Sequence, residues 1–250
     1  MSNIIDTIFT ILSVLLNVIF VIPKSYKWIT DKRYLYAILS SKNEYFGITQ
    51  SRFKSGTIFR SSYPDYTLLT ENSVISIQKI VELLMKVNIK YAMIDTIKDL
   101  HDEIHIGGPI SNVATNSYII EYFTNLKFVD KLSKEKQHKE FYNINRDMIE
   151  YSDDFHGFVV EIKDGIDTKR KLFPVNRQID YMFLIKLTSS DLKCDKTVHL
   201  LFGGTDAGTL AAVDFFTKYY KELYRRVKDK HYFFVVQLHM TSQIPTTSEI

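Results

Sequence analysis

The chain has 250 residues and a formal net charge of +3, from 32 Lys and Arg against 29 Asp and Glu. This near balance, with no extended basic stripe, argues against binding of extended nucleic acid. The single cysteine, Cys194, excludes an internal disulfide and a cysteine-rich metal site, and it is typical of a reducing compartment.

An apolar run near the N-terminus is the first predicted element. Residues 7–23 carry no charge, and apolar residues before Asp6 extend the run, which predicts a transmembrane helix over residues 4–23. A cleaved signal peptide is one alternative, although no basic leader or small-residue cleavage site is present, and a core or interfacial helix is another. The positive-inside rule places the N-terminus outside the inner membrane and the rest in the cytoplasm, because basic residues follow the run: Lys24, Lys27, Lys32 and Arg33.

Residues 24–54 are predicted to form a juxtamembrane helix and a connector, with helical character over residues 32–40. Residues 55–250 are enough for one large domain with a buried core. The 17 Phe and 16 Tyr residues of the chain are expected to fill that core.

Strands and helices alternate through this domain. From the apolar spacing we expect strands over residues 56–60, 89–94, 103–106, 157–163, 178–187, 197–202 and 232–238, and helices over residues 73–87, 112–126 and 209–227. Asn72 or Ser73 is the expected cap of the first helix, and residues 130–151 are expected to be a charged surface excursion. The strands at 157–163 and 178–187 are predicted to pair as a hairpin. The pattern predicts an α/β fold with a mostly parallel, Rossmann-like, three-layer sheet and an inserted antiparallel hairpin.

Two of the predicted strands end in a Gly-Gly pair that leads directly into a helix. Gly107-Gly108 follows Ile-His-Ile, and Gly203-Gly204 follows Leu-Leu-Phe. Glycine lets a ligand approach the main chain, and the start of the next helix offers unpaired N–H groups and the positive end of its dipole. Ligands bind beyond the carboxyl ends of parallel strands, where both turns are expected to lie. The sequence therefore suggests a nucleotide-like small molecule as the ligand.

The predicted ligand-binding residues combine these glycines with nearby hydroxyl, amide and charged side chains. They are Gly107, Gly108, Ser111, Asn112, Thr115, Gly203, Gly204, Thr205, Asp206, Gly208 and Thr209, with Arg60, Ser61 and Ser62 as a phosphate partner. Neither turn matches the dinucleotide pattern or carries the P-loop lysine, so no cofactor is expected. Tight turns also use glycine without a ligand, which is the structural alternative. A bulky residue at Gly108 or Gly204 is expected to block the ligand and to leave the fold intact.

Acidic residues near the turns are the candidates for chemistry. Asp206 is the only acid inside either turn and is the candidate catalytic residue, as a base or a ribose contact, with a helix cap as the alternative. Glu103 and His105 alternate with apolar residues and so lie on one face of a strand. We interpret that face as the polar side of the strand and expect no metal site.

This layout resembles the membrane-anchored, Rossmann-like sensor proteins of prokaryotic immune signalling, in which a transmembrane segment precedes a cytosolic domain of the CARF or SLOG kind. The shared features are the architecture and the turns at residues 106–109 and 202–205, within residues 55–240. The resemblance implies a sensor or effector that binds a nucleotide messenger and signals through self-association, as a homo-oligomer, in antiviral defence. Two alternatives remain open: a membrane-tethered hydrolase that cleaves NAD or a nucleoside, and a non-enzymatic membrane adaptor.

Overall fold

The computed structural model describes residues 27–39, 45–50, 53–54, 67–68, 70–86, 88–93, 102–109, 112–130, 149–151, 156–164 and 167–240. The large sheet consists, in spatial order, of β12 (Tyr232–His239), β10 (Ile179–Leu187), β11 (Val198–Gly203), β5 (Asp102–Ile106), β1 (Tyr45–Gln50) and β4 (Lys90–Met93). The small sheet consists of β7 (Ile149–Tyr151), β6 (Leu126–Asp130), β8 (His156–Asp164) and β9 (Asp167–Val175). Two short strands, β2 (Phe53–Lys54) and β3 (Thr67–Leu68), pair with each other.

The large sheet is mostly parallel, which confirms the predicted α/β class. β4, β1, β5 and β11 run parallel to one another, whereas β10 runs antiparallel to both of its neighbours, β11 and β12. All residues of β5 and β11 are buried, and so are all residues of β10 after the first. Continuous burial of this kind is typical of strands that are covered on both faces.

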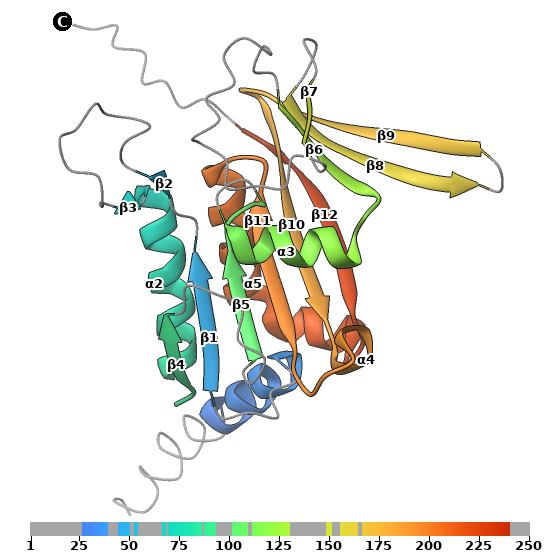
Figure 1. The fold of residues 1–250 in the computed structure, drawn as a ribbon. Coiled ribbons are helices and arrows are strands. Elements are labelled where there is room, and N and C mark those ends of the chain that lie inside the picture. The colour runs from blue at the N-terminus through green and yellow to red at the C-terminus, as the bar shows by residue number, and fades with distance from the viewer. Residues whose placement is uncertain are drawn as a thin grey trace, which may run out of the picture.

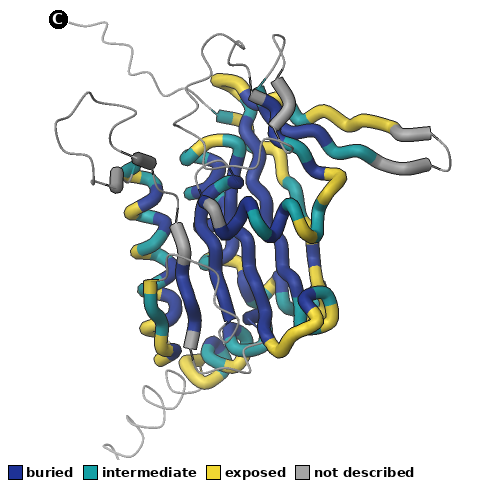
Figure 2. The backbone as a smooth tube through the Cα atoms, viewed as in Figure 1, coloured by how far each residue is buried: buried dark blue, intermediate teal, exposed yellow. Residues whose placement is uncertain are grey.

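Helices cover the two faces of the large sheet. The helices α2 (Glu71–Lys86) and α5 (Asp206–Val227) and the helical residues 27–39 share one buried cluster with one face. On the other face α3 (Val113–Tyr122) crosses the strands, and the small sheet stands beside one end of them (Figure 1). A short helix, α4 (Ser189–Leu192), connects β10 to β11. Figure 2 shows the deepest burial in the strands between these layers.

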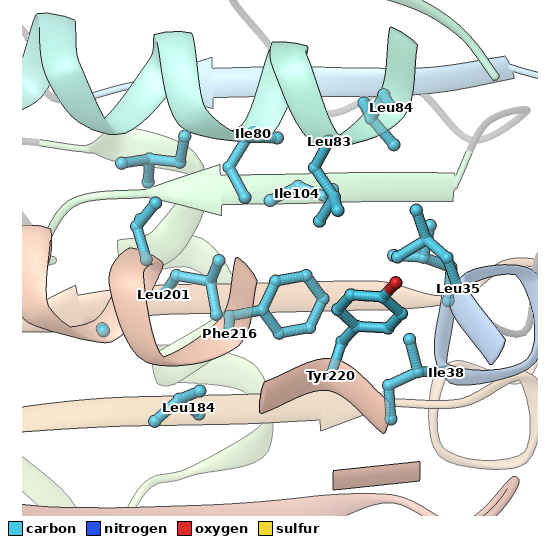
Figure 3. Close-up of a cluster of buried hydrophobic side chains, with 14 of the residues drawn as sticks. Leu35, Ile38, Ile80, Leu83, Leu84, Ile104, Leu184, Leu201, Phe216 and Tyr220 are labelled. Atoms are coloured by element: carbon cyan, nitrogen blue, oxygen red, sulfur yellow. The ribbon is translucent and has the colours of Figure 1, made fainter. Parts of the chain in front are cut away.

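The first cluster is built around α5. Figure 3 shows the rings of Phe216 and Tyr220 between the large sheet, represented by Leu184 and Leu201, and Leu35 of the helical residues 27–39. Phe216, Leu184, Leu201 and Leu35 are fully buried. Burial of one such side chain contributes roughly 1.5–3 kcal/mol to the free energy of folding. The helical residues 27–39 are therefore an integral part of the domain core.

The second cluster is aromatic and joins the two sheets. Phe183 of β10 and Phe202 of β11 are stacked, with ring centroids 4.7 Å apart and planes 4° apart. Phe158 of β8 approaches Phe183 at 4.5 Å between centroids. Ring pairs at these separations add to the free energy gained from burial alone. The small sheet is thereby fixed against the α3 face of the large sheet.

Most predicted elements are confirmed, with shifts at their ends. The strands predicted at 89–94, 103–106, 197–202 and 232–238 are β4, β5, β11 and β12, and the three predicted helices are α2, α3 and α5. Helix α2 begins at Glu71, and the Thr70 hydroxyl accepts a hydrogen bond from the Ser73 N–H at 3.2 Å. Thr70 is therefore the cap, and the prediction of Asn72 or Ser73 is wrong. Helix α3 ends at Tyr122, because residues 126–130 form β6 instead.

The predicted hairpin between residues 157–163 and 178–187 is wrong. β8 pairs antiparallel with β9, from His156 opposite Val175 to Asp164 opposite Asp167, and this hairpin projects from the large sheet (Figure 1). β10 lies inside the large sheet. β9 was not predicted because residues 169–172 are exposed and mostly charged, so they lack the apolar alternation of a half-buried strand.

Of the helix and connector predicted over residues 24–54, the helix is present at residues 27–39, but residues 45–50 form a strand where a connector was expected. β1 lies between β5 and β4 in the large sheet, where Phe46 and Ile48 are fully buried. The sheet therefore begins before residue 55, the predicted start of the domain. In β1 the apolar Phe46 and Ile48 stand among polar residues and a glycine. This pattern is too weak to predict a central strand.

Three predicted elements lie outside the described residues: the transmembrane helix at 4–23, the strand at 56–60 and most of the charged excursion at 130–151. Within the described ranges, no helix combines the length and the apolar character needed to cross a membrane. The membrane anchor stays a prediction.

Two leucines provide a matched test of the core. Leu184 of β10 is fully buried and Leu172 of β9 is 52% exposed. We expect Leu184→Ala to lower the free energy of unfolding by about 2–5 kcal/mol, because it leaves a cavity between α5 and the sheet. Leu172→Ala should change it by no more than about 0.5 kcal/mol. Urea unfolding followed by circular dichroism measures both, and equal losses would contradict the described packing.

Candidate functional site

The two Gly-Gly turns lie side by side. β5 and β11 pair in parallel with Ile106 opposite Leu201, and the Gly107 N–H donates a hydrogen bond to the Leu201 carbonyl at 3.0 Å. A methyl group added to Gly108 would lie 3.4 Å from the carbonyl oxygen of Gly203. Both turns are therefore at the carboxyl edge of the parallel strands, where ligands bind in sheets of this kind.

Asn112 fixes the path from the first turn into α3. Its side-chain oxygen accepts hydrogen bonds from the N–H groups of Ala114 at 3.1 Å and Thr115 at 3.2 Å. Its side-chain amide donates to the Ile106 carbonyl at 3.0 Å. Gly107 has φ of +109°, a conformation that glycine adopts without strain. Asn112 is thus an N-cap that ties the helix to the end of β5, and these contacts use the side chain that was predicted to bind ligand.

The next residues of α3 present polar atoms without an internal partner. Thr115 is fully buried and Asn116 is 4% exposed. The Thr115 hydroxyl and the Asn116 side-chain oxygen have no hydrogen-bond partner among the described residues. An unpaired buried polar group costs about 1–3 kcal/mol, so such groups call for an explanation. Thr115 belongs to the predicted site, whereas Asn116 was missed because an amide inside a helix gives no sequence signal.

The second turn is closed by a carboxylate from β10. Asp180 is 1% exposed, and its two oxygens accept hydrogen bonds from the Thr205 hydroxyl at 2.5 Å and the Tyr181 N–H at 2.7 Å. The Thr205 hydroxyl also accepts from the Gly208 N–H at 3.4 Å, as the N-cap of α5. Asp180 therefore places a negative charge at the positive end of α5, the position predicted for a ligand anion.

The glycines of the second turn are required by this packing. An added Cβ at Gly204 would lie 2.5 Å from the Val175 side chain and 2.6 Å from an oxygen of Asp180. At Gly208 the same atom would lie 2.4 Å from Asp180, and at Gly203 it would lie 2.2 Å from the backbone of Gly208. The expectation that a bulky residue at Gly204 leaves the fold intact is therefore wrong, because β9 and β10 occupy the space it needs.

The remaining residues of the second turn also have internal roles. The Thr209 hydroxyl accepts a hydrogen bond from the Gly203 N–H at 3.0 Å and donates to the Thr205 carbonyl at 3.1 Å. Asp206 is the first residue of α5, where an acid is favourable to the helix dipole. No hydrogen bond or ion pair among the described residues involves its side chain. Asp206 thus lacks an acid–base partner in the described part of the chain.

Four residues of the predicted site lie outside the described residues: Arg60, Ser61, Ser62 and Ser111. Their place at the turns stays a prediction. In the described ranges, no three His, Cys, Asp or Glu side chains gather in a way that could hold a metal ion.

A buried polar cluster lies on the α3 side of β5. One Glu103 oxygen accepts a hydrogen bond from the Tyr118 hydroxyl at 2.7 Å and shares a second hydrogen bond with His105 Nε2 at 2.9 Å. The other Glu103 oxygen lies 3.4 Å from the Lys196 ammonium. All four residues are at most 4% exposed. Glu103 and His105 do lie on one strand face, as predicted, but α3 covers that face.

The environment of the cluster sets its charge. Burial raises the pKa of Glu103, but His105, Tyr118 and Lys196 together outweigh it, so the pKa lies below its ordinary value. Burial, with the Lys196 charge, lowers the pKa of His105 despite the neighbouring Glu103. Burial and Glu103 raise the pKa of the Tyr118 hydroxyl. The cluster therefore holds an ionised Glu103 beside a neutral His105, closed to solvent, which is suited to holding α3 on the sheet.

Comparisons with protein-family models, with curated proteins and with solved structures find no match. The resemblance to CARF- and SLOG-type sensors therefore stays a prediction.

Glycines from the two turns provide a test of this geometry. We expect Gly208→Ala to lower the free energy of unfolding by about 1–3 kcal/mol, because the added methyl group would collide with Asp180. Gly108→Ala is the control, since its added methyl group meets only ordinary contacts, the nearest at 3.4 Å. Thermal unfolding measures both. A stable Gly208→Ala variant would show that Asp180 does not close the second turn.

Buried histidines predict acid sensitivity. Burial and the charge of Lys186 lower the pKa of His199 to about 3, and the pKa of His105 is lowered as well. Since the unfolded chain binds protons at these sites below about pH 6.5 and the folded chain does not, stability should fall as the pH drops below that value. Each histidine contributes up to about 1.4 kcal/mol per pH unit.

Urea unfolding at a series of pH values between 7 and 4 measures this slope. His199→Gln should make the slope shallower, because one of the groups that take up protons on unfolding is removed. A free energy of unfolding that stays constant over this range would rule out neutral, buried histidines.

Proposed function

We propose that this domain binds an anionic, nucleotide-like small molecule at the first Gly-Gly turn, and that the chain is a membrane-anchored sensor. The observation that carries the proposal is a pair of buried oxygens at the start of α3, the Thr115 hydroxyl and the Asn116 amide oxygen. Neither has a hydrogen-bond partner in the described part of the chain, and both lie beside two adjacent Gly-Gly turns. A hydroxyl and an amide oxygen of this kind can bond ribose hydroxyls or the polar edge of a base. The dipole of α3 favours a phosphate group at the same end of the helix.

The first turn is preferred over the second for an electrostatic reason. Asp180 already supplies a carboxylate to the start of α5, and a second anion there would meet its charge. At the first turn, Asn112 takes two N–H groups of α3 but brings no charge. In addition, a side-chain atom added at Gly108 meets two neighbours within 4 Å among the described residues, from Gly203 and Phe202. The dipole of α3 is therefore not neutralised by its N-cap, which supports an anionic ligand at the first turn.

Binding without turnover is the form of the proposal that the described residues favour. Asp206 has no acid–base partner among them, and general acid–base catalysis needs positioned groups within reach of each other. The Glu103 cluster is closed to solvent on all four members. The anchor at residues 4–23, the orientation toward the cytoplasm and the self-association of the sensor are further parts of the proposal, as is a place in antiviral defence, which rests on the resemblance alone.

Mass spectrometry of small molecules that co-purify with the full, detergent-solubilised chain tests the proposal directly. Thermal unfolding in the presence of ATP, NAD, a cyclic dinucleotide or inorganic phosphate tests it in parallel. A ligand at about 100 times its dissociation constant raises the free energy of unfolding by about 2.7 kcal/mol. If none of these molecules stabilises the chain and no small molecule co-purifies with it, the proposed ligand-binding site is ruled out. Conversion of NAD or a nucleoside that disappears in Asp206→Asn would favour the hydrolase instead.

Thr115 allows a sharper test with a matched control. Thr115→Val removes the unpaired hydroxyl at nearly constant volume, so we expect an unchanged or higher stability and about tenfold weaker ligand binding by calorimetry. Thr217→Val is the control, because the Thr217 hydroxyl bonds only carbonyls of its own helix, at 2.9 and 3.2 Å. Equal affinity in the wild type and in Thr115→Val would remove Thr115 from the site.

A further inference from the structure

β12 is an outer strand of the large sheet without the usual protection of such an edge. It pairs with β10 on one side, and no described strand pairs with its other side. Its eight residues, Tyr-Phe-Phe-Val-Val-Gln-Leu-His, contain no proline, lysine, arginine or acid. Natural edge strands are commonly short, charged or interrupted, because a long apolar edge pairs with other chains. The opposite edge follows that rule, since β4 has only four residues.

The surface beside β12 is mostly apolar as well. A groove of about 420 Å³ lies between α5 and β12. Five aromatic and aliphatic side chains line it, from Phe215, Tyr219, Leu223, Phe234 and Val236, together with the charged Glu222 and Arg226 of α5. Tyr219 is 38% exposed and Val236 is 39% exposed. The ring centroids of Phe215 and Tyr219 are 5.0 Å apart, so these two side chains form an aromatic part of the groove wall on α5. Exposed apolar surface next to an open strand edge marks an interaction site.

We propose that a second copy of this chain covers this surface, with β12 paired antiparallel to β12 of the second copy about a two-fold axis perpendicular to the sheet. This symmetry keeps α5 of both copies on the same face of one continuous sheet. On the α5 side of β12 it also matches apolar residues to each other in every register. Phe234, Val236 and Leu238 all lie on the α5 side, and residues directly opposite in an antiparallel pair point to the same side.

Self-pairing suits this edge better than pairing with a foreign peptide. An uncharged strand offers no charge pattern by which to select a partner, whereas an antiparallel copy is complementary by symmetry. This dimer is a specific form of the self-association that the proposed function includes, and its formation does not depend on ligand binding. It places the association in the folded domain, at β12 and α5.

A cysteine scan of β12 tests the symmetry. In a two-fold antiparallel pair, one residue of β12 lies directly opposite the same residue of the second copy. For every other residue, the distance between its two copies increases with its separation from that position along the strand. In a Cys194→Ser background, single cysteines placed in turn at residues 232–239 of the full chain should cross-link with a short bifunctional maleimide at one position and decline on both sides. Met93→Cys on β4, a residue that is 42% exposed, is the control and should not cross-link. Equal cross-linking along the strand, or none at any position, would overturn the proposal.

A charge placed in the seam provides a second measurement. Val236→Lys places an ammonium group in the apolar seam, where dimerisation would remove it from water, so we expect the dissociation constant of the dimer to rise at least about tenfold in analytical ultracentrifugation. Val74→Lys on α2, where valine is 48% exposed, should leave it unchanged. Thr115→Val should also leave it unchanged, so failure of the ligand site and failure of the dimer can be told apart. A dimer that is unaffected by Val236→Lys would place the interface elsewhere.

Discussion

The parallel pairing of β5 with β11 is the constraint on which the rest of the molecule depends. With Ile106 opposite Leu201, both strands end at the same level, and each continues through glycines into a helix on a different face of the sheet. α3 must then cover Glu103 and His105, while α5 must cover the opposite side. The pairing thus decides which side chains meet at the turns, which polar groups are buried and where β10 and β12 can be added.

Strong local patterns were enough to predict much of the fold. β5, β11 and α5 have continuous or helically spaced apolar residues, and sequence reasoning found all three. β1 and β9 were missed for opposite reasons. β1 is central but has few apolar residues, of which Phe46 and Ile48 are buried, whereas β9 is well formed but has an exposed, charged middle. In both strands, pairing partners from other parts of the chain determine the structure, and a local pattern cannot report them.

The candidate site divides in the same way. The two glycine turns follow from short motifs, and Asn112 and Thr205 were recognised as polar residues of those turns. Thr205, however, is the N-cap of α5, a role that was considered for Asp206. The charge that closes the second turn does not follow from a short motif, because Asp180 is 25 residues before Thr205 and lies on a strand that was predicted to belong to a hairpin. Lys196 is likewise 93 residues from Glu103. Such partners are set by the tertiary fold, and they decided which of two similar turns remained available.

Asp180 has a consequence for how a molecule of this kind responds to its surroundings. The carboxylate is part of the chain, so its local concentration at the start of α5 is constant and does not vary with metabolite levels. One of two neighbouring helix dipoles is thereby permanently compensated. Under the proposed function, only the start of α3 is left to bind a diffusible anion, so the occupancy of the first turn varies with the anion while the second turn stays constant.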